Sequence, residues 1–347
     1  MIDRHVYELD YIRELQSRYS SDPGLLERAL YAFGLLEALA EVGMPFCFKG
    51  GTSLMLILDH PARLSTDIDI LVEPGTDVDG FLEKASRIFP FLARTEDVRK
   101  GKSGIVKRHF RFTYYSPVRN TEFYILLDVV YAHLPYAETV HREIRNELLL
   151  TSGENLQVQV PTADCMLGDK LAAFAPHTTG VLLGVEKELE IAKQLFDTAT
   201  LMEYLTDFGK FAESYRAAVR EETEFRGGEW TTEDVLRDTV RACVSIISRG
   251  AYDKEDYAEY LRGIKSLKNH ILLPGYNTDA ATWRACAVMH LASCLLIDRP
   301  YRSIVRAEDY LTESLEGEQY RRLAYIRKQN AGAYAHLVEA TRNLCTL

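Results

Sequence analysis

The sequence is poor in the patterns that mark disulfide-linked and zinc-binding proteins. It has six cysteines in 347 residues, and none of them forms a Cys-x-x-Cys pair. Its nine histidines show no His-x-x-x-His spacing. Scattered cysteines in a chain of this length favour core packing in a reducing cytosol over a disulfide framework or a zinc site.

Long apolar runs and a secretory leader are also missing. The first residues, MIDRHVYELDY, contain no apolar stretch of the kind that a signal peptide needs. The longest apolar stretch, near 285–297, is too short to span a bilayer and includes His290 and Ser293. We therefore expect a buried helix there, and a cytoplasmic protein without a membrane partner.

Excess positive charge is absent from the chain as a whole but present in one segment. The net charge of −10 argues against nonspecific coating of DNA. Residues 94–111 nevertheless carry a local charge of +5, because seven basic residues face Glu96 and Asp97. As the tip of a hairpin, this cluster is either a charged edge that blocks aggregation or an arm that grips nucleic-acid phosphates. The basic residues are Arg94, Arg99, Lys100, Lys102, Lys107, Arg108 and Arg111.

The order of predicted elements divides the chain into two domains. Strand signals occur near 46–49, 66–72, 91–98, 105–115, 121–131 and 156–160, and helical periodicity surrounds them at 3–19, 24–42, 51–58, 77–89 and 138–150. From residue 162 onward only helical patterns remain. We expect an α+β fold with a mixed β-sheet flanked by helices in 1–160, followed by an all-α domain in 161–347.

The stretch 46–72 combines two features that suggest one chemistry. Lys49-Gly50-Gly51-Thr52-Ser53 follows a short apolar strand, and Asp67-Ile68-Asp69 opens another. Asp67 and Asp69 share one face of that strand and repel each other unless a cation lies between them. The glycines allow a ligand to approach the backbone, and free N–H groups at a helix start suit a phosphate. Alone, Asp-x-Asp is usually a solvated strand edge and Gly-Gly a turn; together they predict nucleotide chemistry.

Three further residues are candidates on weaker grounds. Asp128 lies in an apolar strand, where a carboxylate is costly unless it is paired, metal-bound or on an edge that faces water. Lys170 lies beside the apolar stripe of helix 162–175, so it either snorkels to water or points into a cleft. Asp197 continues a polar row with Glu190 and Lys193, which is most simply a solvated salt-bridge face.

The stretch 46–72 resembles the first motif of the DNA polymerase β-like nucleotidyltransferase superfamily. It is most similar to the AbiEii/AbiGii-type toxin nucleotidyltransferases, which include the MenT-like proteins. Their Lys-Gly-Gly-Thr-x-Leu start corresponds to residues 49–54, and their Arg-x-Ser-x-Asp-x-Asp end corresponds to residues 63–69. Residues 168–174 resemble the Asp-Lys-Leu-x-Ala segment of that family. Residues 193–198 resemble its Lys-Asp-x-x-Asp-Leu segment, with departures at Gln194 and Thr198.

The resemblance implies a role for each candidate residue. Asp67 and Asp69 would hold Mg²⁺, or Mn²⁺ as the alternative ion, with Asp128 as the third carboxylate. Lys170 would contact the nucleotide phosphates, and Asp197 would orient or deprotonate the acceptor hydroxyl. The other nucleotide-binding residues would be Lys49, Gly50, Gly51, Thr52, Ser53 and Ser65.

The resemblance also implies a reaction. A metal-dependent toxin nucleotidyltransferase transfers NMP from an NTP to an acceptor hydroxyl, here the 3′ end of a tRNA, and releases pyrophosphate. A cognate antitoxin would be its protein partner. Two alternatives stay open from the residues: transfer to a small molecule such as an antibiotic, and a non-catalytic nucleotide-binding or protein-binding module.

Overall fold

The computed structural model describes residues 1–97 and 107–346, which divide into two compact units. Unit 1 comprises Met1–Ala163 together with the short return segment Asn269–Pro274. Unit 2 comprises Asp164–Lys268 and Gly275–Leu347. The return segment joins unit 1 through the backbone, since Leu64 N donates to His270 O and Leu272 N to Ala62 O. Dividing the chain only once, between residues 160 and 161, would leave the return segment out of unit 1.

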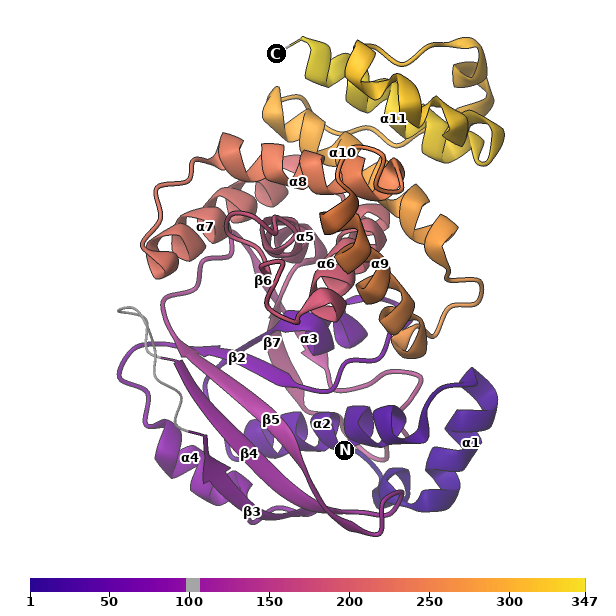
Figure 1. Cartoon of the computed structure of the whole chain (residues 1–347). Helices are drawn as coiled ribbons and strands as arrows, with labels where there is room; N and C mark the ends of the chain where they lie inside the picture. Colours follow the sequence, from indigo (N-terminus) through magenta and orange to yellow (C-terminus); the bar gives the residue numbers. More distant parts are fainter. Residues whose placement is uncertain (98–106, 347) are drawn as a thin grey trace. The chain divides into compact units, whose positions relative to one another are not determined.

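Unit 1 is built on one mixed sheet (Figure 1). Its described strands have the order β3-β4-β5-β2-β1-β7-β6, with β2 parallel to β5 and β1 parallel to β7. The strands are β1 (Cys47–Lys49), β2 (Ile68–Val72), β3 (Phe91–Glu96), β4 (Lys107–Ser116), β5 (Thr121–Tyr131), β6 (Thr139–Glu143) and β7 (Gln157–Pro161). The helices of this unit are α1 (Leu9–Tyr19), α2 (Pro23–Glu41), α3 (Gly50–Ile57) and α4 (Val78–Ala85), after a 3₁₀ turn at Arg4–Tyr7.

One face of this sheet forms the core of unit 1. Strict alternation along β4 and β5 buries one set of side chains completely, as expected for a sheet with one covered face. That set is Phe110, Phe112, Tyr114, Ile125, Leu127 and Val129. Helix α2 packs against β2 and β5 and also against α4. Asp22 caps α2 by accepting from Leu25 N, and Pro23 opens the helix.

One predicted helix of unit 1 is wrong. The segment 138–150 is not helical: Thr139–Glu143 forms β6, which pairs antiparallel with β7, and irregular chain follows it. The β-branched pair Thr139 and Val140 opposes Pro161 and Val160 across the ladder. Pairing with β7 therefore overrides the local helical pattern of the downstream leucines.

Unit 2 is all helical within the described residues. Its α-helices are α5 (Ala163–Ala173), α6 (Glu188–Leu201), α7 (Phe208–Arg226), α8 (Thr232–Ile247), α9 (Lys254–Leu267), α10 (Thr278–Leu296) and α11 (Ala331–Cys345). Helix α10 is the buried helix expected near 285–297 and packs against α6, α8 and α11. The helical sequence patterns at 306–313 and 316–327 form 3₁₀ segments instead of α-helices, Ala307–Thr312 and Glu318–Lys328. No described helix is both long and apolar enough for a membrane span.

Candidate active site

Four polar residues form one row across the sheet of unit 1. In the strand register, Lys49 on β1 opposes Asp69 on β2, Asp69 opposes Asp128 on β5, and Asp128 opposes His109 on β4. Directly opposed residues point to the same face of a sheet. The row therefore lies on the face opposite the apolar core, and two carboxylates that are far apart in sequence become direct neighbours.

Each outer carboxylate of the site is held by a basic side chain of unit 1. His109 Nδ1 lies 2.7 Å from Asp128 Oδ1. Arg28 Nη2, from α2, lies 3.3 Å from Oδ1 of Asp67, the residue just before β2. These contacts offset part of the repulsion between the carboxylates and fix where they point. Asp128 is thus neither a buried unpaired charge nor an edge residue, because β5 is an interior strand.

The double glycine fits closely against this row. Gly50 has φ +78°, and a Cβ built on it would lie 2.1 Å from Oδ2 of Asp69. A Cβ on Gly51 would lie 2.9 Å from Ser65 Oγ and 2.6 Å from Nη2 of Arg63. Gly50 therefore requires glycine for space and for backbone conformation, whereas a side chain at Gly51 would displace Arg63 and Ser65. Ser65 therefore lies beside the glycine turn.

The hydroxyl groups of the motif point inward. Thr52 Oγ1 donates to the backbone oxygen of Asp67 at 2.5 Å, and Ser53 Oγ donates to the oxygen of Gly50 at 2.9 Å. Both residues are fully buried, whereas Gly50 and Gly51 are partly exposed. In this conformation the two hydroxyls brace the turn between β1 and α3. The role that the family resemblance gives them at a nucleotide phosphate stays a prediction; the partly exposed residues of the turn are Gly50 and Gly51.

The three aspartates supply the type of ligand that a divalent cation needs but are not gathered around one point. Within residues 1–97 and 107–346, no three His, Cys, Asp or Glu side chains are gathered, as placed, into a group that could hold a metal ion. The composition of the row nevertheless fits a hard cation, because Asp67, Asp69 and Asp128 offer only oxygen ligands. Gly50 itself adds no side chain over the carboxylate of Asp69. Arg28 and His109 each contact one carboxylate oxygen, Oδ1 of Asp67 and Oδ1 of Asp128.

Comparison with known families places the chain in one of them. The family model described as "Nucleotidyl transferase AbiEii toxin, Type IV TA system" matches residues 34–286, which is most of the chain. The chain belongs to this AbiEii toxin family. It is therefore a nucleotidyltransferase of a toxin–antitoxin system, and the family implies an antitoxin as its partner. The row of carboxylates and the glycine turn lie inside the matched residues.

Solved structures add only a likeness of fold. The protein JHP933 from Helicobacter pylori is 15% identical, with TM-score 0.43 over 78% of this chain and 92% of that chain. A candidate nucleotidyltransferase from H. pylori is also 15% identical, with TM-score 0.42 over 78% of this chain and 95% of that chain. These similarities are too low to support conclusions about activity. No curated protein matches the chain.

Lys170 and Asp197, the two candidate residues in the helical half, form an ion pair. Lys170 Nζ on α5 lies 3.3 Å from Asp197 Oδ2 on α6, and the side chains are 6% and 1% exposed. Snorkelling of Lys170 to water and a solvated face for Asp197 are therefore both wrong. The catalytic roles that the family resemblance gives them stay predictions; what the structure gives is a buried ion pair within unit 2.

The basic hairpin is largely neutralised where it is described. Arg108 pairs with Asp79 at 2.8 Å and Glu96 at 2.7 Å, and these two carboxylates raise its pKa above the usual value. Arg111 pairs with Asp97 at 3.1 Å, and Arg94 also reaches Asp79. This arrangement favours the charged-edge interpretation, since β3 is an edge strand. Arg99, Lys100 and Lys102 lie outside the described residues.

Sequence reasoning missed the residues that hold the carboxylates. Arg28 lies on a helix that reads as plain core packing, and His109 lies within the basic segment. One signal existed for His109: it alternates with Phe110 and Phe112, so it had to face away from the core together with Asp128 if β4 and β5 pair. No local pattern marks Arg28, because its partner is reached only in the folded chain.

Proposed function

We propose that this AbiEii toxin transfers a nucleoside monophosphate from an NTP to the 3′-terminal hydroxyl of a tRNA in the cytoplasm, in a reaction that depends on Mg²⁺. The observation that carries the proposal is the register that sets Asp69 against Asp128, directly beside Gly50. Paired carboxylates next to an open backbone turn are what a metal-bound triphosphate requires.

The reaction is an in-line displacement. The acceptor oxygen forms a bond to the α-phosphorus, the bond to the β-phosphate oxygen breaks, pyrophosphate leaves, and the hydroxyl proton passes to a base. Asp67, Asp69 and Asp128 would hold the divalent ion, which supplies charge stabilisation at the phosphoryl oxygens when bound.

The chain itself does the positioning. The partly exposed glycines admit a phosphate to the start of α3, where backbone N–H groups are unpaired by helix geometry. Lys49, the residue before α3, has a side chain that cannot accept from those groups, so it gives the helix no side-chain cap. Lys49 lies in the same cross-strand row as Asp69. Arg28 and His109 keep two of the carboxylates oriented.

The test is nucleotide transfer by the full chain. Each labelled NTP is incubated with Mg²⁺ and total tRNA, and wild type is compared with Asp69→Asn and Asp128→Asn. The matched control is Asp10→Asn, an exposed aspartate in the first turn of α1. We expect label at the tRNA 3′ end that both site variants abolish and the control retains.

Three outcomes would contradict the proposal. Transfer that survives both site substitutions would rule out the carboxylate site. Labelling of a small alcohol or aminoglycoside in place of RNA would indicate an antibiotic-modifying enzyme. NTP binding without turnover on any acceptor would indicate a nucleotide-binding module.

A further inference from the structure

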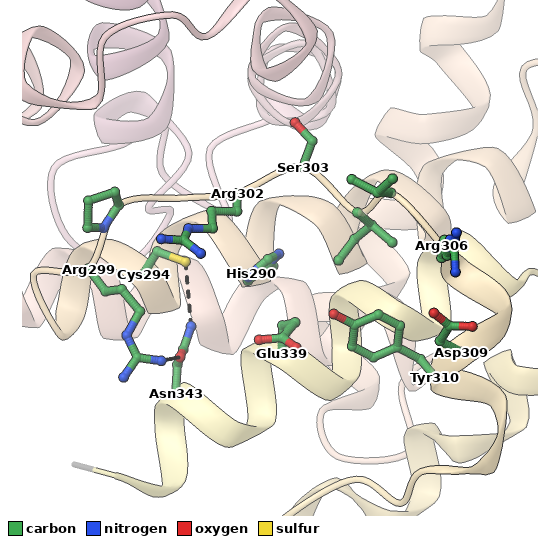
Figure 2. Close-up of a pocket in the computed structure, with 13 residues that line it drawn as sticks. His290, Cys294, Arg299, Arg302, Ser303, Arg306, Asp309, Tyr310, Glu339 and Asn343 are labelled. Carbon is green, nitrogen blue, oxygen red and sulfur yellow. Dashed lines mark hydrogen bonds between the residues drawn. The ribbon is translucent and has the colours of Figure 1, made fainter.

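Unit 2 contains a cavity of about 740 Å³ that the family match does not cover (Figure 2). All of its lining residues follow residue 286, where the AbiEii match ends. His290 and Cys294 come from α10, and Glu339 and Asn343 come from α11. The remaining wall is the irregular segment 299–306 and the 3₁₀ segment that follows it.

Three arginines from that irregular segment line the cavity. Arg299, Arg302 and Arg306 are all exposed, and no carboxylate among the described residues forms an ion pair with any of them. Other arginines of this acidic chain are paired, for example Arg216 with Asp298 and Arg237 with Glu233. A cluster of uncompensated guanidinium groups is favourable when an anion completes it.

One of the three arginines, Arg299, is anchored to the interior of unit 2. Arg299 Nη1 donates to Asn343 Oδ1 at 3.3 Å, and Asn343 Nδ2 donates to Ser293 Oγ at 3.1 Å. Asn343 is only 2% exposed, so this amide anchors one arginine to the interior of unit 2. Figure 2 shows Arg299 and Asn343 meeting at one end of the cavity and Arg306 at the other.

The other side chains that line the cavity offset little of the positive charge of the arginines. Glu339 is engaged by Arg342 at 3.0 Å, which leaves Asp309 as the other lining carboxylate. His290 Nδ1 contacts His336 Nδ1 at 3.1 Å, and burial lowers the pKa of His290 to about 3 and of His336 to about 4. Both imidazoles are therefore neutral near pH 7, and the positive charge comes from arginine alone.

We propose that this cavity binds backbone phosphates of the RNA acceptor, at a site separate from the carboxylate row. The inference rests on the proposed function, which makes RNA the acceptor. The eight residues 299–306 span at most about 25 Å, so their arginines match phosphates spread over several nucleotides better than one compact triphosphate. Tyr310 adds an aromatic ring to the same wall, as single-strand binding surfaces commonly do.

The experiment measures the affinity of the full chain for tRNA over a range of salt concentrations. The double variant Arg302→Ala/Arg306→Ala is compared with Arg216→Ala/Arg237→Ala, which removes the same charge from ion-paired, exposed sites of unit 2. We expect the first variant to weaken binding at least tenfold and to lower the slope of log K against log[salt] by about 1 to 2, since each phosphate contact contributes about 1. Arg302→Lys/Arg306→Lys should retain most of the slope.

NTP affinity without RNA separates the two sources of phosphate. Loss of NTP binding with tRNA binding intact would assign the cavity to free nucleotide and overturn the proposal, as would unchanged tRNA affinity and slope. If the control variant Arg216→Ala/Arg237→Ala weakens tRNA binding equally, the effect comes from net charge alone, which would also overturn the proposal. If wild type labels tRNA but the arginine variants bind it normally, the inference fails and the proposed function stands. If wild type binds tRNA through these arginines without labelling it, the proposed function fails instead.

Discussion

Replacing Gly50 by alanine tests the close approach between the glycine turn and the carboxylate row. The new Cβ would lie 2.1 Å from Oδ2, 2.8 Å from Cγ and 2.9 Å from Cβ of Asp69, all inside the 3.0 Å that real Cβ atoms respect. Asp69 or the turn must therefore move by about 1 Å. A misplacement of about 1 Å can cost roughly a hundredfold in rate, so we expect nucleotide transfer by Gly50→Ala to fall by about that factor.

The backbone contribution is removed by a matched control. Gly43 has φ +71°, close to the +78° of Gly50, but nothing lies within 4 Å of a Cβ built on it. Left-handed backbone costs a non-glycine residue about 1–2 kcal/mol, so Gly43→Ala should lose stability by that amount and keep full transfer activity. The assays are chemical denaturation and transfer from labelled NTP to tRNA. If Gly50→Ala transfers at the rate of Gly43→Ala, the glycine turn has no part in positioning Asp69 and the reasoning is wrong.

Three further changes test other parts of the chain. Lys170→Met should destabilise the protein to denaturant by about 3–5 kcal/mol, because it leaves Asp197 charged and buried, and adding Asp197→Leu should recover part of that loss; a loss below 1 kcal/mol would contradict the buried pair. A hydrogen bond to Asp238 raises the pKa of His177 above its ordinary 6.5, so the contribution of this pair to stability is complete below about pH 6.5 and is lost as the pH rises through the folded pKa. The difference in Tm between wild type and His177→Gln should therefore shrink between pH 6 and pH 9. A difference that stays constant with pH would refute this prediction. Arg28→Met should lower transfer about tenfold through Asp67 while NTP affinity changes little, with Arg28→Lys restoring part of the rate; unchanged turnover in Arg28→Met would remove Arg28 from the site.

The parts of the fold with strong periodicity could be predicted from the sequence. The α2 helix with its Asp22 cap, the β4 and β5 strands and the change to helices after residue 160 all follow from local patterns. The helix expected at 138–150 is where local pattern failed, because β6 exists only through its pairing with β7. Long-range pairing of this kind leaves no reliable local signal.

The candidate site divides in the same way. The glycine turn and the Asp67-Ile68-Asp69 pattern are contiguous and could be found by reading the chain. The partners Arg28 and His109 could not, because each is brought to its carboxylate by packing of α2 or pairing of β4. The burial of Lys170 likewise could not be predicted from its own helix, because its counter-ion Asp197 comes from a second helix, α6.

The apolar core enforces the geometry of the carboxylate row. A slip of one residue between β2 and β5 would turn Asp128 onto the covered face and bring Leu127 or Val129 out of it. Exposing one such side chain costs about 1.5–3 kcal/mol, and burying the carboxylate without His109 costs more. The meeting of Asp69 and Asp128 is therefore selected by the same alternation that buries the neighbouring residues. It follows that core substitutions in β5, far from any substrate, should act on transfer through the register of these two aspartates.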